Sequence, residues 1–441
     1  MTPSSSFSRP MNRRDLLRLG GAALGAAAAA PLLSACGSPT GGSSSGGKTE
    51  LTFASAKFYG KSDIGAIVEQ YNGSQSKIHV TYRELPPPSS STEVHQQLVQ
   101  SLGRGDGSLD VFTQDIVWIA EFAGAGWALP LDQYVDAATK AEYFPGLIEA
   151  CTYGGKLTAL PWAVDSGMLY YRKDLLDTAG IEVPETWDDL VKAGRQLQSA
   201  GKAKYGFLWQ GKQAEVLICD LVEFVGSAGG RILGADGKTV AIADPAAQSA
   251  VKFMYDTMNS LGITPKDVLS WDEEPSRRPF TAGQAAFLRN WAYVYAIAQD
   301  PKESQVVDKV GIAPLPAFAG GKSSACLGGY QYGVSASSKN KEAAVEFVKW
   351  LSSPDIQLKF ATDVGLAPTR PAVFDDPRLK AANPFMVQLK DVFTGGTPRP
   401  VTPKYPQLSL ALQSSVSKAL TSGDIAGSLS EAKTALDKSL A

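Results

Sequence analysis

Strand-like and helix-like patterns alternate from residue 51 onward, and this alternation constrains the fold more than any other feature. Residues 51–54, 78–82 and 110–112 are apolar or alternate as strands do. Residues 64–71 and 93–102 instead place apolar side chains at helical spacing. Strands that alternate with helices in this way predict a largely parallel sheet with crossover helices. The predicted fold class is therefore α/β.

The same organisation continues toward the C-terminus. Thr186 opens a capping-box pattern before a helical stripe, which predicts that Trp187 is a core residue. Asn340 is expected to cap another amphipathic helix, which ends before Pro354. Residues 407–440 are predicted to be helical and amphipathic.

Length and composition exclude several classes of protein. A chain of 441 residues is too long for one ordinary core, which stops growing at about 250–300 residues, so two lobes are expected. A hydrophobic content of 44% excludes a disordered chain, and a net charge of −2 argues against nucleic-acid binding. His79 and His95 are the only histidines, which argues against a multi-histidine metal centre. We expect neither a metal nor a cofactor.

The N-terminus resembles a bacterial twin-arginine export signal that ends in a lipobox. Arg13 and Arg14 precede a short Ala/Gly-rich apolar run, and Cys36 stands at the lipidation position. Residues 1–35 are accordingly expected to be removed, unless the run is an uncleaved anchor. Met11 is an alternative start.

The mature protein is expected to be lipid-anchored on the outer face of the bacterial cytoplasmic membrane. Residues 36–49 form a Gly/Ser-rich tether behind the lipidated cysteine. Cys151, Cys219 and Cys326 remain, so at most one disulfide forms, and the sequence does not decide whether it does.

Motifs for enzymatic chemistry have no structural context. The GSSSG pattern at 42–46 resembles a nucleophile elbow but lies in the tether. Gly321-Lys322-Ser323 lacks the earlier glycine of a phosphate-binding loop. The sequence therefore predicts no enzyme of the hydrolase, kinase or zinc classes.

Several segments, in their order and spacing, resemble the sugar-binding proteins of ABC importers, in particular the trehalose/maltose-binding branch. The segments that carry the resemblance are DVFTQDIVW at 110–118, GWALPL at 126–131, LPWAVD at 160–165, LYYRKDLL at 169–176, WQGKQ at 209–213, residues 287–293, LGGY at 327–330, PRP at 398–400 and YPQL at 405–408.

This resemblance implies a periplasmic-binding-protein-like type II fold, with two α/β lobes around a ligand cleft. The chain would cross the hinge between the lobes three times. Lobe one would comprise residues 50–163 and 317–365, and lobe two residues 164–316 and 366–441. Ligand would favour the closed arrangement of the lobes.

The same resemblance places the ligand site, and its residue types suit a sugar. Aromatic rings cover apolar C–H faces, whereas carboxylates and guanidinium groups hydrogen-bond to hydroxyls. The predicted substrate-binding residues are Asp115, Asp165, Trp291, Tyr293, Gly329, Tyr330, Arg399, His95 and Trp162.

Three of these residues also have simpler interpretations. Asp115 follows a strand and could cap a helix. Asp165 could stabilise the hinge rather than contact ligand. Arg399 lies between two prolines and could form a surface ion pair.

The resemblance implies a monomer that captures an α-linked glucose disaccharide and delivers it to the permease subunits of an importer, without catalysis. One alternative is a surface glycoside hydrolase that uses two carboxylates. Another is a binding protein for an oligosaccharide, glycerol phosphate or peptide. A phosphate ligand would favour several convergent basic groups, of which only Arg399 stands out.

Overall fold

The computed structural model describes residues 47–58, 63–234, 238–390, 393 and 396–441. The predicted export signal, the lipidation site at Cys36 and most of the tether lie outside the described residues. No helix within these ranges is both long enough and apolar enough to cross a membrane.

The first sheet has the strand order β12-β6-β11-β3-β1-β2, with β13 paired to β11. Strands β1, β2 and β3 run parallel to one another, as predicted. Strand β11 is antiparallel to both β3 and β6. The bounds are β1 (Thr49–Ala56), β2 (Ile78–Leu85), β3 (Val111–Asp115), β6 (Leu160–Ser166), β11 (Ala325–Val334), β12 (Ala367–Pro368) and β13 (Gly396–Pro398).

The second sheet has the order β10-β7-β9-β8. Only β8 and β9 are parallel, because β7 pairs antiparallel with both β9 and β10. Its strands are β7 (Met168–Arg172), β8 (Tyr205–Leu208), β9 (Ala285–Asn290) and β10 (Val310–Ala313). A separate hairpin joins β4 (Thr152–Tyr153) to β5 (Lys156–Leu157).

The prediction of a largely parallel sheet is therefore wrong for most pairs beyond the first three strands, although β8 and β9, and β11 and β13, are parallel. Strand β6 continues into β7 across the single residue Gly167, so one extended segment leaves the first sheet and enters the second. No crossover helix joins β6 to β7, so this connection does not require a parallel pair of strands. Strand β11 then enters the first sheet against the direction of both its neighbours.

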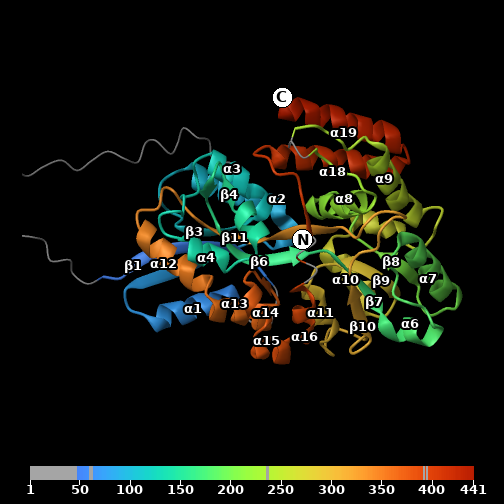
Figure 1. The fold of residues 1–441 in the computed structure, drawn as a ribbon, viewed down its shortest axis with the longest axis horizontal. Helices are drawn as coiled ribbons and strands as arrows, with labels where there is room; N and C mark the ends of the chain where they lie inside the picture. Colours follow the sequence, from blue (N-terminus) through green and yellow to red (C-terminus); the bar gives the residue numbers. More distant parts are fainter. Residues whose placement is uncertain (1–46, 59–62, 235–237, 391–392, 394–395) are drawn as a thin grey trace, which may run out of the picture. The chain divides into compact units, whose positions relative to one another are not determined.

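A first hydrophobic core packs helices on the first sheet (Figure 1). Its apolar side chains come from the helical stripes that the sequence indicates, such as Ile67 and Val68 on one helix and Phe347 on another. The elements of this region are α1 (Ile64–Ser74), η1 (Pro88–Ser90), α2 (Ser91–Gly103), η2 (Ile116–Trp118), α3 (Ile119–Gly124), α4 (Ala137–Ala141), α5 (Pro145–Ala150), α12 (Lys341–Leu351), α13 (Pro354–Lys359) and η4 (Phe360–Val364).

A second core packs helices on the second sheet and includes the two C-terminal helices. Trp187 is buried in it and stacks on Phe224 with ring centroids 4.6 Å apart, which confirms its predicted core position. The helices of this region are α6 (Lys173–Ala179), α7 (Trp187–Ser199), α8 (Glu215–Ser227), α9 (Pro245–Met258), η3 (Lys266–Ser270), α10 (Glu273–Thr281), α11 (Tyr293–Ala298), α18 (Tyr405–Ser422) and α19 (Ile425–Leu440).

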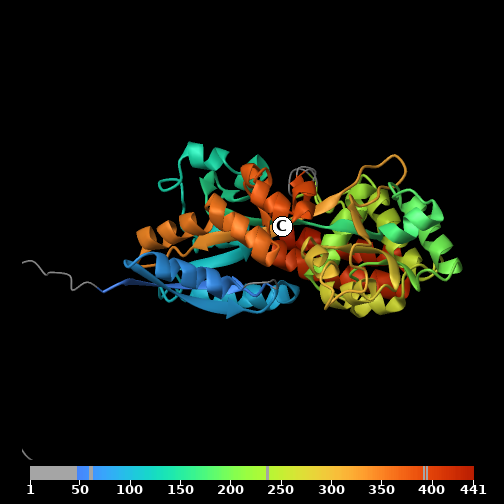
Figure 2. The same cartoon turned by 90° about the horizontal axis from the view of Figure 1, so that it is seen from below.

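A third core joins elements of both sheets through three short helices. Figure 2 shows the orange and red helices α13–α16 between the blue N-terminal elements and the green central ones. The three short helices are α14 (Pro371–Phe374), α15 (Pro377–Ala382) and α16 (Pro384–Gln388). The division into two lobes and the lobe boundaries stay a prediction.

The predicted helix starts have the expected positions. Thr186 caps α7, because its hydroxyl accepts from the amide of Asp189 at 3.1 Å and donates to the Asp189 carboxylate at 2.7 Å. Helix α12 begins after Asn340, but the Asn340 side chain donates to the carbonyl of Glu50 instead of capping the helix.

Candidate functional site

One cavity is lined by residues of both sheets and of the helices around them. Its space, together with the solvent at its mouth, amounts to about 1170 Å³. The lining residues are Lys57, Phe58, Pro87, Pro88, Ser89, Ser91, Asp115, Ala163, Val164, Asp165, Glu215, Val216, Cys219, Glu273, Glu274, Trp291, Ala292, Tyr293, Gly328, Gly329, Tyr330, Val364, Gly365, Leu366, Ala367 and Arg399.

Arg399 connects two carboxylates in the wall of this cavity. One guanidinium nitrogen lies 2.6 Å from the Asp115 carboxylate and another lies 2.8 Å from the Glu215 carboxylate. The hydroxyls of Tyr405 and Ser409 also donate to Glu215. Burial acts to lower the pKa of Arg399, but Asp115 together with Cys219, Tyr405 and Cys326 outweighs it, and the pKa is raised. Arg399 therefore bridges the two acidic side chains with charge-assisted hydrogen bonds.

Asp165 lies at the end of β6, and its carboxylate is held by the backbone. Its Oδ1 accepts from the amide of Ser166 at 2.8 Å and from the amide of Ala292 at 3.4 Å. Burial raises the pKa of Asp165 to about 7, against the lowering effect of these two bonds. The group therefore titrates near neutral pH.

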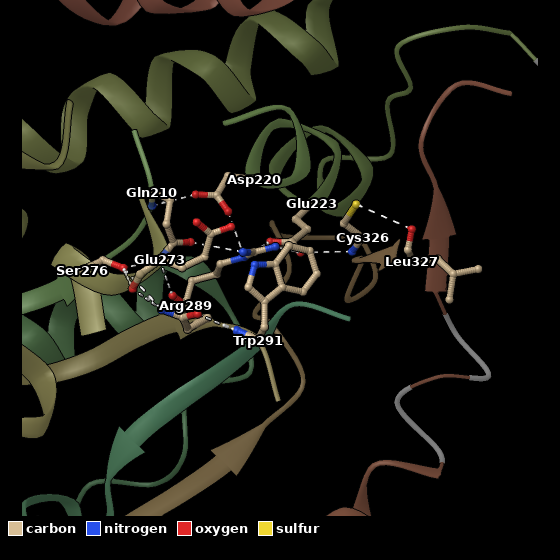
Figure 3. A network of polar contacts seen from close by, with 10 residues as sticks. Gln210, Asp220, Glu223, Glu273, Ser276, Arg289, Trp291, Cys326 and Leu327 are labelled. Carbon is tan, nitrogen blue, oxygen red and sulfur yellow. Dashed lines mark hydrogen bonds and ion pairs between the residues drawn. The ribbon is translucent and has the colours of Figure 1, made fainter. Parts of the chain in front are cut away.

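Trp291 follows β9, and a buried guanidinium packs against one face of its indole ring. The Arg289 side chain lies 4.2 Å from the centroid of the indole ring (Figure 3). Arg289 pairs with Glu223 at 2.5 Å and with Asp220 at 2.9 Å, and donates to the Gln210 side chain at 3.1 Å. Because these partners fix Arg289 from several directions, one face of the indole is held and the ring forms a rigid platform.

Tyr293 begins α11 and shares a carboxylate with an arginine. Its hydroxyl donates to Oε1 of Glu274 at 2.7 Å, while Arg277 pairs with Oε2 of Glu274 at 2.6 Å. Both oxygens of Glu274 are thereby occupied, and the Tyr293 ring is held at the cavity wall.

Gly329 occupies a backbone position that excludes other residues. Its φ is +123°, and a Cβ atom there would lie 2.1 Å from the carbonyl oxygen of Ala163 on the paired strand β6. The next residue, Tyr330, packs its ring edge-on against Phe58, with centroids 5.1 Å apart. The close approach of the backbone at Gly329 to β6 thus fixes the position of Tyr330 in the cavity wall.

The arrangement combines aromatic rings with hydrogen-bond acceptors and lacks the features of a metal site. Within the described ranges, no group of three or more His, Cys, Asp or Glu side chains is placed to hold a metal ion. Cys151, Cys219 and Cys326 are buried free thiols, so the disulfide that the sequence left open is not formed among them.

Comparison with known proteins places this geometry in a family. Residues 60–358 match the model of the bacterial extracellular solute-binding proteins. The chain belongs to this family. A probable ABC transporter-binding protein of Deinococcus radiodurans is 36% identical over 332 residues, which cover 73% of this chain and 77% of the relative.

Solved structures of solute-binding proteins share the fold. The maltose-bound MalE3 of T. maritima is 37% identical with a TM-score of 0.81, over 88% of this chain and 99% of that one. A solute-binding protein of Agrobacterium radiobacter in complex with ribitol is 26% identical with a TM-score of 0.77, over 88% and 98% of the two chains. These similarities confirm the periplasmic-binding-protein-like α/β fold expected from the sequence.

Most of the predicted site residues of this solute-binding protein lie together at the cavity. They are Asp115, Asp165, Trp291, Tyr293, Gly329, Tyr330 and Arg399.

Two of the simpler interpretations also hold in part. Asp115 accepts from the amide of Val117 at 3.2 Å and so caps η2, and Arg399 forms ion pairs, although buried ones.

His95 does not line the cavity of the solute-binding protein. Its Nε2 lies 2.6 Å from the carboxylate of Glu121, and its ring stacks on Phe122 with centroids 5.7 Å apart. The imidazole is therefore engaged between α2 and α3.

Trp162 also lies away from the cavity lining. It is buried in the first core, where it stacks on Tyr332 with centroids 5.0 Å apart. Because side chains alternate along β6, its neighbour Ala163 lines the cavity instead.

Sequence reasoning missed several lining residues of the binding protein, above all Glu215, Glu273 and Glu274. Each lies in the first turn of a helix, where acidic residues are common for reasons of helix stability alone. The pattern of the sequence therefore offered no signal that would separate them from ordinary surface acids.

Proposed function

We propose that this solute-binding protein captures an α-linked glucose disaccharide, trehalose- or maltose-like, for an ABC importer. The observation that carries the proposal is the gathering of Trp291, Tyr293 and Tyr330 with Asp115 and Asp165 around one cavity. Aromatic faces cover the C–H faces of a sugar, and carboxylates accept hydrogen bonds from its hydroxyls. The maltose in the related T. maritima protein supports the same ligand class.

The charges at the cavity favour a neutral ligand over an anionic one. Arg399 is already paired with Asp115 and Glu215, and Lys57 lies 3.0 Å from Glu84. A phosphate or carboxylate ligand needs convergent cations that are free to receive it. Glycerol phosphate is therefore disfavoured as the ligand.

Catalysis is disfavoured for a related reason. A glycoside hydrolase needs one carboxylic acid that gives a proton and a second carboxylate that attacks or activates water. Arg399 and the amide of Val117 both bind Oδ1 of Asp115, and these contacts disfavour an attack by that oxygen on a substrate. We therefore assign the protein to binding and delivery, in which the closed, ligand-bound form docks on the permease subunits as a monomer.

Calorimetric titration of the purified protein with trehalose and maltose tests the ligand. One-to-one binding of either disaccharide is expected, with no glucose released on prolonged incubation. Release of glucose would assign the protein to hydrolysis instead. Heat exchange with glycerol phosphate or a peptide and none with either sugar would contradict the proposal.

Anchoring is the second part of the proposal. Residues 1–35 serve as the export signal and Cys36 carries the lipid, so that the body is held at the outer face of the bacterial cytoplasmic membrane. Mass spectrometry of the membrane-bound protein is expected to find an acylated Cys36 at its N-terminus, and Cys36→Ser to release the protein into the medium. An unmodified Cys36 would contradict the anchor and leave the ligand assignment standing.

A further inference from the structure

Three consecutive acidic residues begin α10, and their environments differ. Asp272 pairs with Lys212 at 2.7 Å, and Glu274 is bound by Arg277 and by the Tyr293 hydroxyl. Glu273 lies between them and forms no ion pair within 4.0 Å with any residue that the structure describes. Its Oε2 is buried and has no hydrogen-bond partner among the same residues.

The carboxyl of Glu273 lies at the edge of the aromatic platform. It lines the cavity together with Trp291 and Asp165, and Figure 3 shows it beside Arg289 and the indole. Burial raises the pKa of Glu273, although Arg289 and the Trp291 side chain both favour its carboxylate form. A buried acceptor in this state is costly to the protein unless an occupant of the cavity donates to it.

A sugar that stacks on Trp291 would supply such a donor. Stacking places the C–H face of the ring against the indole and leaves the hydroxyls at the ring edge. Protein groups that border the indole therefore lie close to the hydroxyls of the sugar, and Glu273 is one of these groups. Each of its neighbours in sequence pairs its carboxylate with a cation, whereas Glu273 has no such partner among the described residues and its Oε2 is left to accept from a ligand.

We propose that Glu273 is a further ligand-binding residue, whose carboxyl accepts a hydrogen bond from one hydroxyl of the sugar that stacks on Trp291. The assignment rests on the proposed function, because it needs a polyhydroxylated ligand. It adds a specificity-determining contact that neither the sequence patterns nor the resemblance singles out.

Calorimetric titration of Glu273→Ala and Glu273→Gln with the disaccharide that the wild-type protein binds tests the assignment. Glu273→Ala is expected to weaken binding about tenfold, and Glu273→Gln less, because its amide oxygen still accepts. Asp272→Asn removes a charge from the same helix start, where the partner is Lys212, and is expected to leave the dissociation constant unchanged. The melting temperature of Glu273→Gln is expected to match or exceed that of the wild type, because it removes a buried acid that forms no ion pair with a described residue.

Monodeoxy analogues of the same disaccharide separate a direct contact from a structural effect. One analogue lacks the hydroxyl that donates to Glu273. The wild-type protein should bind this analogue more weakly than the parent sugar. The Glu273→Ala variant should bind it no more weakly than the parent sugar. An unchanged dissociation constant in Glu273→Ala, or an equal loss with every analogue, would overturn the assignment while the proposed function stands. A wild-type protein that binds no sugar would overturn both.

Discussion

The guanidinium of Arg399 lies 2.6 Å from the carboxylate of Asp115, although 284 positions of sequence separate the two residues. Asp115 ends β3 of the first sheet, whereas the second partner of Arg399, Glu215, begins α8 beside the second sheet. The arginine thus couples a strand of the first sheet to a helix of the second core in the wall of one cavity.

This triad predicts unequal effects of two substitutions on stability. Arg399→Ala leaves the buried Asp115 and the partly buried Glu215 without their cation and is expected to cost about 3–5 kcal/mol of unfolding free energy. Asp115→Asn leaves Arg399 paired with Glu215 and is expected to cost less. Urea denaturation measures both, and an equal loss in the two variants would contradict the coupling.

The aromatic platform predicts a loss of binding on truncation. Trp291→Ala and Asp115→Ala are each expected to weaken binding of the disaccharide at least about tenfold, or about 1.4 kcal/mol, without unfolding the protein. Trp127→Ala is the matched control, because Trp127 packs on the first core outside the cavity. Wild-type dissociation constants in both site variants, measured by calorimetry, would refute the site.

The pKa of Asp165, which burial raises to about 7, predicts a pH dependence of binding. The carboxylate accepts hydrogen bonds from hydroxyls better than the protonated acid, so affinity should rise as the pH increases from 6 to 8. Titrations across this range should show a smaller slope for Asp165→Asn, and an unchanged slope would contradict the role of Asp165.

The same pKa predicts how stability depends on pH. The folded protein keeps a proton on Asp165 between its ordinary pKa of 3.8 and about 7, whereas the unfolded chain releases it. This residue's contribution to the free energy of unfolding is therefore complete below pH 3.8 and is lost as the pH rises toward 7. Denaturation of wild type and Asp165→Asn at pH 4, 5.5 and 7 should show that the difference between them grows in favour of the variant.

Two adjacent glycines predict opposite tolerance to alanine. A Cβ atom at Gly329 would lie 2.1 Å from a backbone oxygen, whereas one at Gly328 would meet the Trp291 ring at an ordinary 3.6 Å. Gly329→Ala should therefore lower the melting temperature by several degrees, and Gly328→Ala should change it little. Equal melting temperatures for the two variants would show that the backbone here adapts.

Local patterns predicted much of the fold from the sequence, because periodicity and caps are set by neighbours in the chain. The helix that follows Thr186 and the first three strands are examples. The direction of the later strands depends on β11 entering between β3 and β6, which no local spacing encodes. The sequence therefore predicted the fold class and the directions of the first three strands, but not those of the later strands.

The cavity residues show the same limit. The aromatic and acidic residues near strand ends, such as Asp115 and Trp291, lie at the cavity as expected. Side chains alternate along β6, so Ala163 faces the cavity and Trp162 faces the core. His95 instead contacts Glu121 of another helix. Glu273 differs from its acidic neighbours Asp272 and Glu274 only in the tertiary contacts of its side chain.

A thermal-shift screen of the purified protein tests the central claim most directly. The candidate ligands are trehalose, maltose, sucrose, longer maltodextrins and glycerol phosphate. A ligand that binds only the folded state stabilises it by about 2.7 kcal/mol at a hundredfold excess over the dissociation constant. We expect trehalose or maltose to raise the melting temperature and glycerol phosphate to leave it unchanged. No shift with any sugar, or a shift with glycerol phosphate alone, would contradict the assignment of this cavity to a neutral disaccharide.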